Sequence, residues 1–292
     1  MKSNRTFHWL SSNNVSNEKE LVDLNSKLGN FYSELASRTQ YNIMIKGDDA
    51  EQPVDEVTKA FINWFKTQPF ENILEVGCGT GRIRKHLPLK VKPCQYTGTE
   101  VSAEVIDNNR KKWPENNWFF ESVYDLTFSP GQFDLVFSFY VLEHLVFPEK
   151  ALEKMFQLVK PGGSISLIFP DFVSTKRLPS QFIGLGFDRS AKEKLSKART
   201  IDALVSLYDS RVRLKNALEK VGNSPGSFTI NANPVCLFYP GQHIWPDFDA
   251  VYIAHKKEIA HWAASKGMEV TYPAGTGGLF AEHAFMVLKK PI

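Results

Sequence analysis

A short apolar segment followed by three closely spaced glycines most constrains how this chain can fold. Residues 73–76 (Ile-Leu-Glu-Val) have the pattern of a strand that is buried in a parallel sheet. Gly77, Gly79 and Gly81 follow at alternate positions, and residues 83–87 then have the pattern of a helix start. A strand, a glycine turn and a helix together bring backbone N–H groups close to a nucleotide. The turn therefore predicts a nucleotide-binding crevice at the carboxyl end of a sheet.

The spacing of the glycines distinguishes two kinds of nucleotide site. A dinucleotide-binding turn reads G-x-G-x-x-G, which would need a glycine where Arg82 stands. The sequence from Glu75 to Gly81 instead reads E-x-G-x-G-x-G. This pattern resembles the S-adenosylmethionine-binding turn of class I methyltransferases.

Later segments keep the same register. Residues 95–100 form a second predicted strand that ends in Glu100, about 20 residues beyond the turn, where a βαβ unit places the carboxylate that binds ribose. Strands are predicted at 118–121, 133–138 and 164–169, with a helix at 148–159. The runs around "FDLVFS…VLEHL" and "LVKPGGSISLIFP" resemble the small-molecule branch of the class I methyltransferases.

The resemblance implies an α/β fold and three regions. The fold would be a seven-stranded, mostly parallel sheet with helices on both faces and an antiparallel last strand. Residues 52–172 and 250–292 would form this core. Residues 1–51 would be an N-terminal helical cap, and residues 173–249 would be an inserted helical lid above the substrate.

The same resemblance implies S-adenosylmethionine as the cofactor and S-adenosylhomocysteine as its product. Within the turn, the glycines would let the backbone approach the methionine portion. Outside the turn, carboxylate, hydroxyl and apolar groups would hold the ribose, the adenine and the methionine end. The predicted cofactor-binding residues are Glu75, Gly77, Cys78, Gly79, Gly81, Glu100, Val101, Ser122, Val123, Phe139 and Tyr41.

Two residues after the fourth strand are the catalytic candidates. Tyr140 is expected to point towards the methyl acceptor, and His144 could act as a general base. The alternative for His144 is a structural or cofactor-side role. Ubiquinone-pathway O-methyltransferases carry E-x-x-E-H here and use it for a metal, whereas this chain has Tyr140 at the first position. Because that change removes an oxygen ligand, no required metal is predicted.

Three further residues are candidates for the acceptor site. Asp171 ends the fifth strand at the crevice, although a cap of a helix or turn is the equal alternative. His243 and Trp245 belong to an aromatic loop of the predicted lid. Residues 188–222 carry nine Lys/Arg against five acids. This excess is interpreted as a solvated helix face, with an anionic acceptor as the minority interpretation.

Segments outside the core motifs have weaker patterns. Residues 7–10 form an aromatic knot, interpreted as a packed strand or turn or, alternatively, a flap. Helices are predicted at 18–38, 53–67 and 255–266, with one or two more in 190–222. Residues 228–239 are expected to be extended, and 268–272 and 283–288 are the last strands. The glycine-rich residues 274–278 are interpreted as a hairpin loop with no helix behind it.

Composition limits the partners and the compartment. A net charge of +3 is too small to argue for a nucleic-acid partner. Three cysteines without C-x-x-C spacing argue for neither disulfides nor zinc, which suits a reducing, cytoplasmic setting. No apolar run is long enough for a membrane span, and residues 1–17 lack the apolar core of a secretory signal. The oligomeric state is left open.

The predicted function is transfer of a methyl group to an oxygen or nitrogen of a small metabolite, mainly by proximity and orientation. Two alternatives remain: a protein that binds the cofactor for a non-methylating or scaffold role, and a protein or tRNA methyltransferase. The predicted lid favours an enclosed small acceptor.

Overall fold

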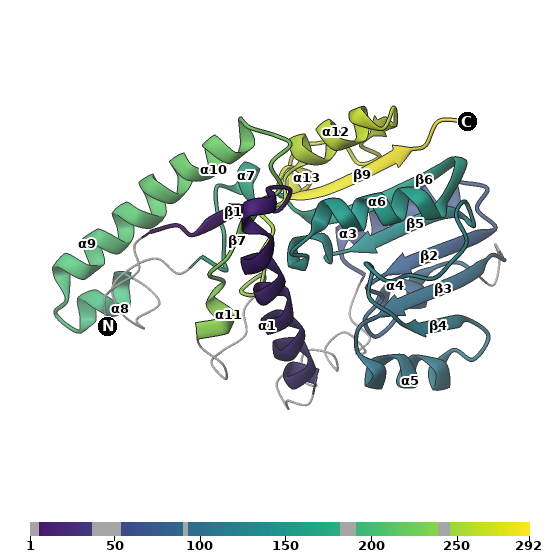
Figure 1. The fold of residues 1–292 in the computed structure, drawn as a ribbon, viewed down its shortest axis with the longest axis horizontal. Helices are drawn as coiled ribbons and strands as arrows, with labels where there is room; N and C mark the ends of the chain where they lie inside the picture. Colours follow the sequence, from purple (N-terminus) through teal and green to yellow (C-terminus); the bar gives the residue numbers. More distant parts are fainter. Residues whose placement is uncertain (1–5, 37–53, 90–92, 182–190, 239–245) are drawn as a thin grey trace.

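A mixed seven-stranded sheet forms the centre of the computed structural model, which describes residues 6–36, 54–89, 93–181, 191–238 and 246–292 (Figure 1). In spatial order its strands are β4 (Asn117–Phe120), β3 (Gln95–Glu100), β2 (Asn72–Val76), β5 (Phe133–Phe139), β6 (Val159–Pro170), β9 (His283–Lys289) and β8 (Glu269–Thr271). Only β9 runs antiparallel, pairing with β6 and with β8. The predicted sheet and its antiparallel last strand are confirmed.

The strand order changes direction at β2. This strand pairs in parallel with β3 on one side and with β5 on the other. The connections leaving β2 and β5 therefore separate to opposite sides of the sheet. In open α/β sheets, such a switch point leaves a crevice at the carboxyl ends of the strands.

Alternating strand residues supply two hydrophobic clusters, one on each face of the sheet. Val136 of β5 belongs to one cluster, whereas its neighbours Leu135 and Phe137 belong to the other. The first cluster is covered by α6 (Pro148–Leu158), α12 (Lys256–Ser265) and part of α1 (Glu18–Ala36). The second is covered by α3 (Glu56–Lys66), α4 (Arg82–His86) and α5 (Ala103–Lys112).

Capping side chains decide where the main helices begin. The Asp55 side chain accepts a hydrogen bond from the Thr58 N–H, so α3 begins at Glu56 and not at Pro53 as predicted. Pro53 lies outside the described residues. Ser102 caps α5 in the same way, by accepting a hydrogen bond from the Val105 N–H.

The N-terminal segment and the insertion pack together beside the sheet. β1 (Trp9–Ser11) pairs antiparallel with β7 (Thr229–Asn231), which confirms the packed strand rather than the flap for the aromatic knot. After η1 (Val15–Asn17), α1 runs past the carboxyl ends of the strands (Figure 1). The insertion continues as an arm that projects away from the sheet, made of α8 (Ala191–Ser196), α9 (Thr200–Tyr208), η3 (Asp209–Arg213) and α10 (Leu214–Gly222).

The extended segment predicted at 228–239 is wrong beyond its first residues. β7 ends at Asn231, whose side-chain oxygen accepts a hydrogen bond from the Asn233 N–H and turns the chain. Pro234 follows and cannot donate to a ladder, and α11 (Val235–Phe238) begins immediately after it.

The expectation that no helix follows the glycine-rich loop is also wrong. Gly278, with a φ of 57°, precedes the single turn of α13 (Leu279–Glu282). A helix of four residues is too short to produce the periodic apolar pattern from which helices are predicted.

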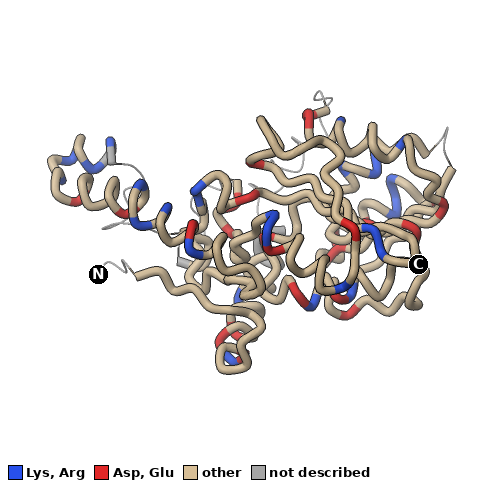
Figure 2. The backbone as a smooth tube through the Cα atoms, turned by 90° about the horizontal axis from the view of Figure 1, so that it is seen from above, with Lys and Arg blue, Asp and Glu red and all other residues tan. Residues whose placement is uncertain are grey.

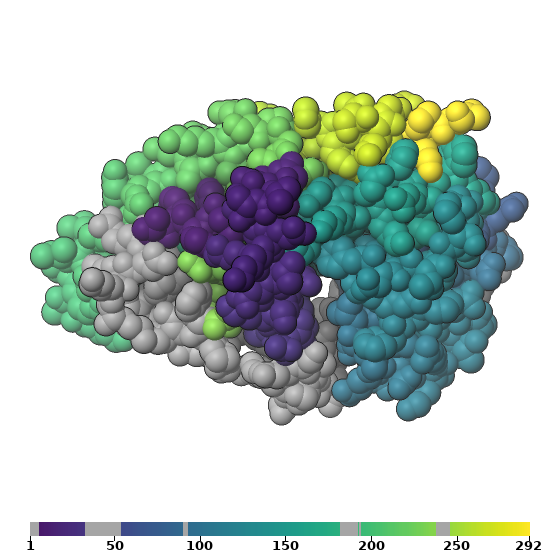
Figure 3. Space-filling model, in the orientation of Figure 1, coloured from purple at the N-terminus to yellow at the C-terminus, as the bar shows by residue number. Residues whose placement is uncertain are grey.

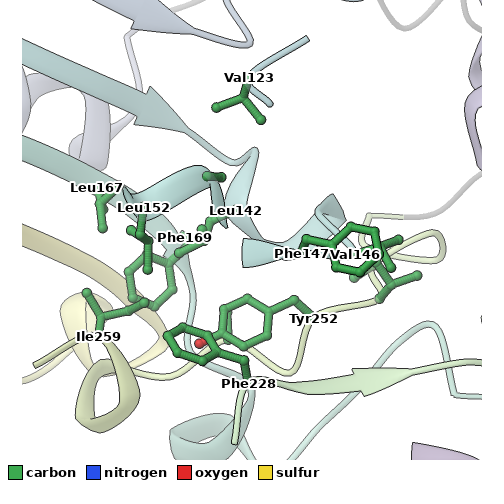
Figure 4. Close-up of a cluster of buried hydrophobic side chains, with 14 of the residues drawn as sticks. Val123, Leu142, Val146, Phe147, Leu152, Leu167, Phe169, Phe228, Tyr252 and Ile259 are labelled. Atoms are coloured by element: carbon green, nitrogen blue, oxygen red, sulfur yellow. The ribbon is translucent and has the colours of Figure 1, made fainter. Parts of the chain in front are cut away.

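Aromatic side chains connect the insertion to the sheet core. Figure 4 shows Tyr252 and Phe228 lying side by side in the same hydrophobic cluster as Phe169 of β6. The rings of Tyr252 and Phe228 are 5.9 Å apart between centroids. The segment around Tyr252 is thus part of the main core, which holds its neighbouring residues close to the carboxyl ends of the strands.

We expect Phe61→Ala to destabilise the protein by about 3–5 kcal/mol, because the cavity would lie between α3 and the sheet. The Phe61 ring is fully buried and packs against Phe137, Phe139 and Phe285. Urea unfolding would measure this loss. Val22→Ala, at a position 54% exposed on α1, is the control and should change stability by less than about 0.5 kcal/mol. Equal effects of the two substitutions would contradict the packing described here.

Candidate active site

The glycine turn lies at the switch point of the sheet. Gly77, Gly79 and Gly81 all have positive φ angles, which side chains rarely adopt. A Cβ at Gly77 would meet Val141 at 2.5 Å, and one at Gly81 would meet Trp113 at 2.3 Å. A Cβ at Gly79 would meet nothing within 4 Å. Two glycines therefore allow close packing, whereas the space beside the Cα of Gly79 is open.

Glu100 holds the glycine turn in place. One of its carboxylate oxygens accepts a hydrogen bond from the Gly79 N–H at 3.1 Å, and the other accepts one from the Val101 N–H at 2.7 Å. Burial raises the pKa of Glu100, and these backbone hydrogen bonds oppose the shift. The carboxylate predicted to bind ribose thus also positions the backbone predicted to bind the methionine portion. Val101 itself is 54% exposed at the same edge.

Glu75 lies beneath the turn and is almost completely buried. Its carboxylate accepts a hydrogen bond from the Tyr96 hydroxyl at 2.5 Å. Burial is the main reason that the pKa of Glu75 rises to about 8, with the Tyr96 hydrogen bond and the Arg82 charge acting in the opposite direction. Cys78 is also buried, and burial raises the pKa of its thiol. Both residues support the turn from below.

The predicted adenine-side residues follow β4. The Ser122 hydroxyl accepts a hydrogen bond from the Tyr124 N–H at 3.3 Å, and the Ser122 carbonyl accepts one from the Asp125 N–H. Val123 is buried in the turn that these hydrogen bonds form. Ser122 therefore stands at the carboxyl edge of the sheet, two strands from the switch point.

Tyr140 directly follows the end of β5 and has a strained backbone conformation. Its φ is 54°, although it is not a glycine, and its N–H donates to the Ile168 carbonyl at 2.8 Å. Its hydroxyl lies 3.0 Å from Nδ1 of His283, the first residue of β9. Burial is the main cause that raises the pKa of Tyr140. Phe139, before it, is buried against Phe61.

His144 lies among three carboxylates. Its Nε2 is 3.8 Å from Glu143 Oε1, and its Nδ1 is 3.5 Å from Asp249 Oδ2. Burial lowers the pKa of His144, but the charges of Asp249, Glu143 and Asp247 outweigh burial and raise it overall. This raised pKa makes His144 a weaker general base near neutral pH than its sequence position suggested.

The His144 cluster joins three parts of the chain. Glu143 and His144 belong to η2 (Leu142–His144), the two aspartates belong to residues 246–250, and the Tyr32 ring of α1 packs edge-on to the His144 ring at 6.3 Å between centroids. Figure 3 shows a hollow between the purple atoms of α1 and the blue and teal atoms of the sheet.

Sequence reasoning missed three polar residues at this edge. Asp247, Asp249 and His283 lie in segments without a motif, and only the fold brings them to the crevice. An Asp with positive φ, as at Asp247, leaves no signal that distinguishes it from an ordinary loop residue.

Asp171 is accounted for by the capping alternative. Its side chain accepts a hydrogen bond from the Ser174 N–H at the start of α7 (Phe172–Thr175) and another from the Lys256 N–H. Its carboxylate also forms an ion pair with Lys256 at 3.1 Å and is buried. Both oxygens are engaged in holding α7 to α12. Tyr41, His243 and Trp245 lie outside the described residues.

The basic residues of the insertion lie away from this edge. Figure 2 shows Lys and Arg along the projecting arm, interspersed with acidic residues. The crevice side instead gathers Glu143, Asp247 and Asp249. This distribution agrees with the interpretation that the excess of Lys and Arg in the insertion belongs to a solvated helix face.

Comparisons with known proteins agree with this α/β fold. Residues 74–167 match the family model described as "Methyltransferase domain". An uncharacterized methyltransferase of Schizosaccharomyces pombe is 33% identical over 123 residues, which cover 38% of this chain and 44% of that protein. An O-methyltransferase of Penicillium expansum is 29% identical over 46% of this chain and 50% of its own length. The chain thus spans about half the length of these relatives.

Two further comparisons are more distant. A ubiquinone biosynthesis O-methyltransferase of Coxiella burnetii is 27% identical over 38% of this chain and 49% of its own length. A solved structure from Pyrococcus horikoshii OT3 aligns over 81% of this chain and 89% of its own with a TM-score of 0.49 and 11% identity.

Residues 74–167 therefore match a methyltransferase domain, and the sheet order and the E-x-G-x-G-x-G turn agree with that match. None of the described helices is both long and apolar enough to cross a membrane.

We expect Glu75→Gln to flatten the pH dependence of stability in the absence of cofactor. In the unfolded chain Glu75 ionises above about pH 4.5, whereas the folded protein keeps its proton up to about pH 8. The unfolded state then binds fewer protons, so this residue reduces stability as pH rises between those values. Glutamine cannot titrate. The wild type should therefore lose stability relative to the variant from about pH 5 to about pH 8.

Urea unfolding at those two pH values would measure the effect. The difference between wild type and variant isolates Glu75, because all other buried acids remain in both proteins. Glu71→Gln, at an exposed position one residue before β2, is the matched control and should follow the wild type. Parallel pH profiles of Glu75→Gln and the wild type would contradict the raised pKa.

Proposed function

We propose that this protein transfers the methyl group of S-adenosylmethionine to an oxygen or nitrogen of a small metabolite. The observation that carries the proposal is the position of Glu100, the glycine turn and Tyr140 along one edge of the sheet. The relatives named as O-methyltransferases support acceptor oxygen in particular.

The chemistry is an in-line displacement. A lone pair of the acceptor forms a bond to the methyl carbon while the carbon–sulfur bond breaks, which leaves S-adenosylhomocysteine with a neutral sulfur. The O–H or N–H proton of the acceptor is released to water. The sulfonium is already a good leaving group, so the protein mainly has to orient the two partners and exclude water. The open space beside Gly79 would admit the methionine portion and the Glu100 carboxylate would hold the ribose, with Ser122 and Val123 beside the adenine.

Tyr140 is the residue best placed to orient the acceptor. Its hydroxyl can donate to His283 Nδ1 and thereby leave an oxygen lone pair to receive a hydrogen bond from an acceptor hydroxyl or amine. The raised pKa keeps Tyr140 protonated and so able to play this part. His144 lies at the acceptor side of the same crevice, among carboxylates, where it would contact the acceptor rather than remove its proton.

Calorimetric titration with S-adenosylhomocysteine tests the cofactor site. We expect Glu100→Gln to weaken binding about tenfold, or about 1.4 kcal/mol, because an amide cannot accept hydrogen bonds from both Gly79 and Val101 while binding ribose. Glu104→Gln, an exposed acid in the first turn of α5, is the matched control and should bind as the wild type does. No binding to the wild type would overturn the proposal.

Release of S-adenosylhomocysteine from S-adenosylmethionine then distinguishes the acceptor classes. The protein would be offered a panel of small phenols and amines, and separately protein and tRNA preparations. Turnover with a member of the small-molecule panel supports the proposal. Turnover with the macromolecules alone would favour a protein or tRNA methyltransferase, and binding without turnover on any panel would favour the scaffold alternative.

A further inference from the structure

The projecting arm carries a large share of the exposed apolar side chains. Of the twelve large apolar residues that are exposed in the described parts of the chain, five lie on this arm: Leu195, Ile201, Leu204, Tyr208 and Val212. Ile201 is 74% exposed and Leu204 is 66% exposed. Single exposed apolar residues are common on soluble proteins, whereas a group of them marks a surface that meets a protein or a membrane. The arm therefore carries a candidate interaction surface.

Four of these side chains form one row along a continuous helical segment, because α9, η3 and α10 follow one another without a break from residue 200 to 222. At steps of three and four residues, one side of this segment carries the row that we call the apolar stripe: Ile201, Leu204, Tyr208 and Val212. The buried Ala203 and Leu214 lie on the opposite side, where α9 contacts α8 and α10 contacts α7. The stripe therefore faces away from the rest of the protein, on the part of the arm that extends from the sheet in Figure 1.

Two exposed cations border the apolar stripe. Arg211 lies three positions after Tyr208, and Lys215 lies three positions after Val212, so each neighbours the stripe on the helix surface. Neither cation has an acidic partner among the residues that the structure describes. Their methylene stems can lie along the apolar side chains while the charged groups reach outward.

The acidic residues of the same segment do not balance these two charges. Each acidic side chain of residues 200–222 forms an ion pair with a basic residue: Asp202 with Arg199, Asp209 with Arg213, and Glu219 with Lys176. Arg211 and Lys215 therefore leave an excess of positive charge beside the stripe, on the arm whose basic residues Figure 2 shows in blue. An anionic partner would match this charge.

An anionic membrane surface matches this combination better than other partners do. In the headgroup region of a bilayer, apolar side chains reach the acyl chains while neighbouring Lys and Arg bind lipid phosphates. A second copy of the chain would instead bring like charges together. A stable protein interface uses about 20–30 residues a side, far more than one stripe supplies. A nucleic acid offers no apolar phase for Ile201 and Leu204.

We propose that the arm docks on anionic lipid headgroups through the apolar stripe. Ile201 and Leu204 would enter the boundary of the acyl chains, with the amphipathic Tyr208 side chain at the level of the headgroups. Arg211 and Lys215 would bind lipid phosphates. A contact of this kind lies on the bilayer and needs no spanning segment, so it is compatible with a sequence that lacks a long apolar run. It goes beyond the proposed methyl transfer and does not depend on it.

Vesicle flotation of the full chain tests the docking surface. The probes are vesicles of phosphatidylcholine mixed with phosphatidylglycerol, and vesicles of phosphatidylcholine alone. We expect the wild type to bind the mixed vesicles at least about tenfold more tightly than the neutral ones, and to bind more weakly as salt is added. Ile201→Gln combined with Leu204→Gln should weaken binding to the mixed vesicles at least about tenfold, because glutamine is polar but still favours a helix. Arg211→Gln combined with Lys215→Gln should weaken it by at least about tenfold as well.

Two matched controls separate the stripe from the rest of the surface. Val22→Gln replaces an apolar side chain on α1 that is 54% exposed. Lys111→Gln combined with Lys257→Gln removes two exposed cations, one from α5 and one from α12. Both controls should bind the mixed vesicles as the wild type does, and circular dichroism with urea unfolding would show that every variant is folded.

Three outcomes would overturn the inference. The first is no binding of the wild type to the mixed vesicles. The second is equal binding by the wild type and the variant that changes Ile201 and Leu204, which would leave only a general attraction of charge. The third is a dimer in sedimentation velocity that this variant dissociates, because a second copy of the chain would then cover the stripe.

Discussion

The candidate site depends on one topological constraint, the position of β2 between β3 and β5. Parallel strands end at the same edge of a sheet, and the change of direction at β2 keeps that edge open. The glycine turn after β2, Glu100 at the end of β3 and Tyr140 after β5 therefore lie along one edge of the sheet. At this edge, Glu100 makes the decisive contact, because its carboxylate holds the N–H of Gly79 and so shapes the turn.

The proposed acceptor side of the site differs in character from the proposed cofactor side. Backbone groups and one carboxylate form the proposed cofactor side, whereas a histidine surrounded by acids forms the other. These acids make an anionic acceptor a poor electrostatic match.

The core of the fold could be predicted because its signals are local. The apolar run at 73–76, the glycines behind it and the acids at the strand ends each lie within a few residues of one another. The predictions from sequence were wrong where the local residue patterns are short or mixed. The single turn of α13 has too few residues for a pattern, and Pro234 ended an extended segment that its apolar neighbours favoured.

The sequence by itself determined the sheet, the glycine turn and the carboxylate at Glu100, since strand and turn chemistry is encoded in adjacent residues. Only the tertiary structure decided which distant polar groups share the crevice. Asp247 and Asp249 reach His144 because Tyr252 and its neighbours pack into the main core and their backbone N–H groups bond to the Glu143 carbonyl. Contacts between segments so far apart in the chain arise from packing, and no local pattern records them.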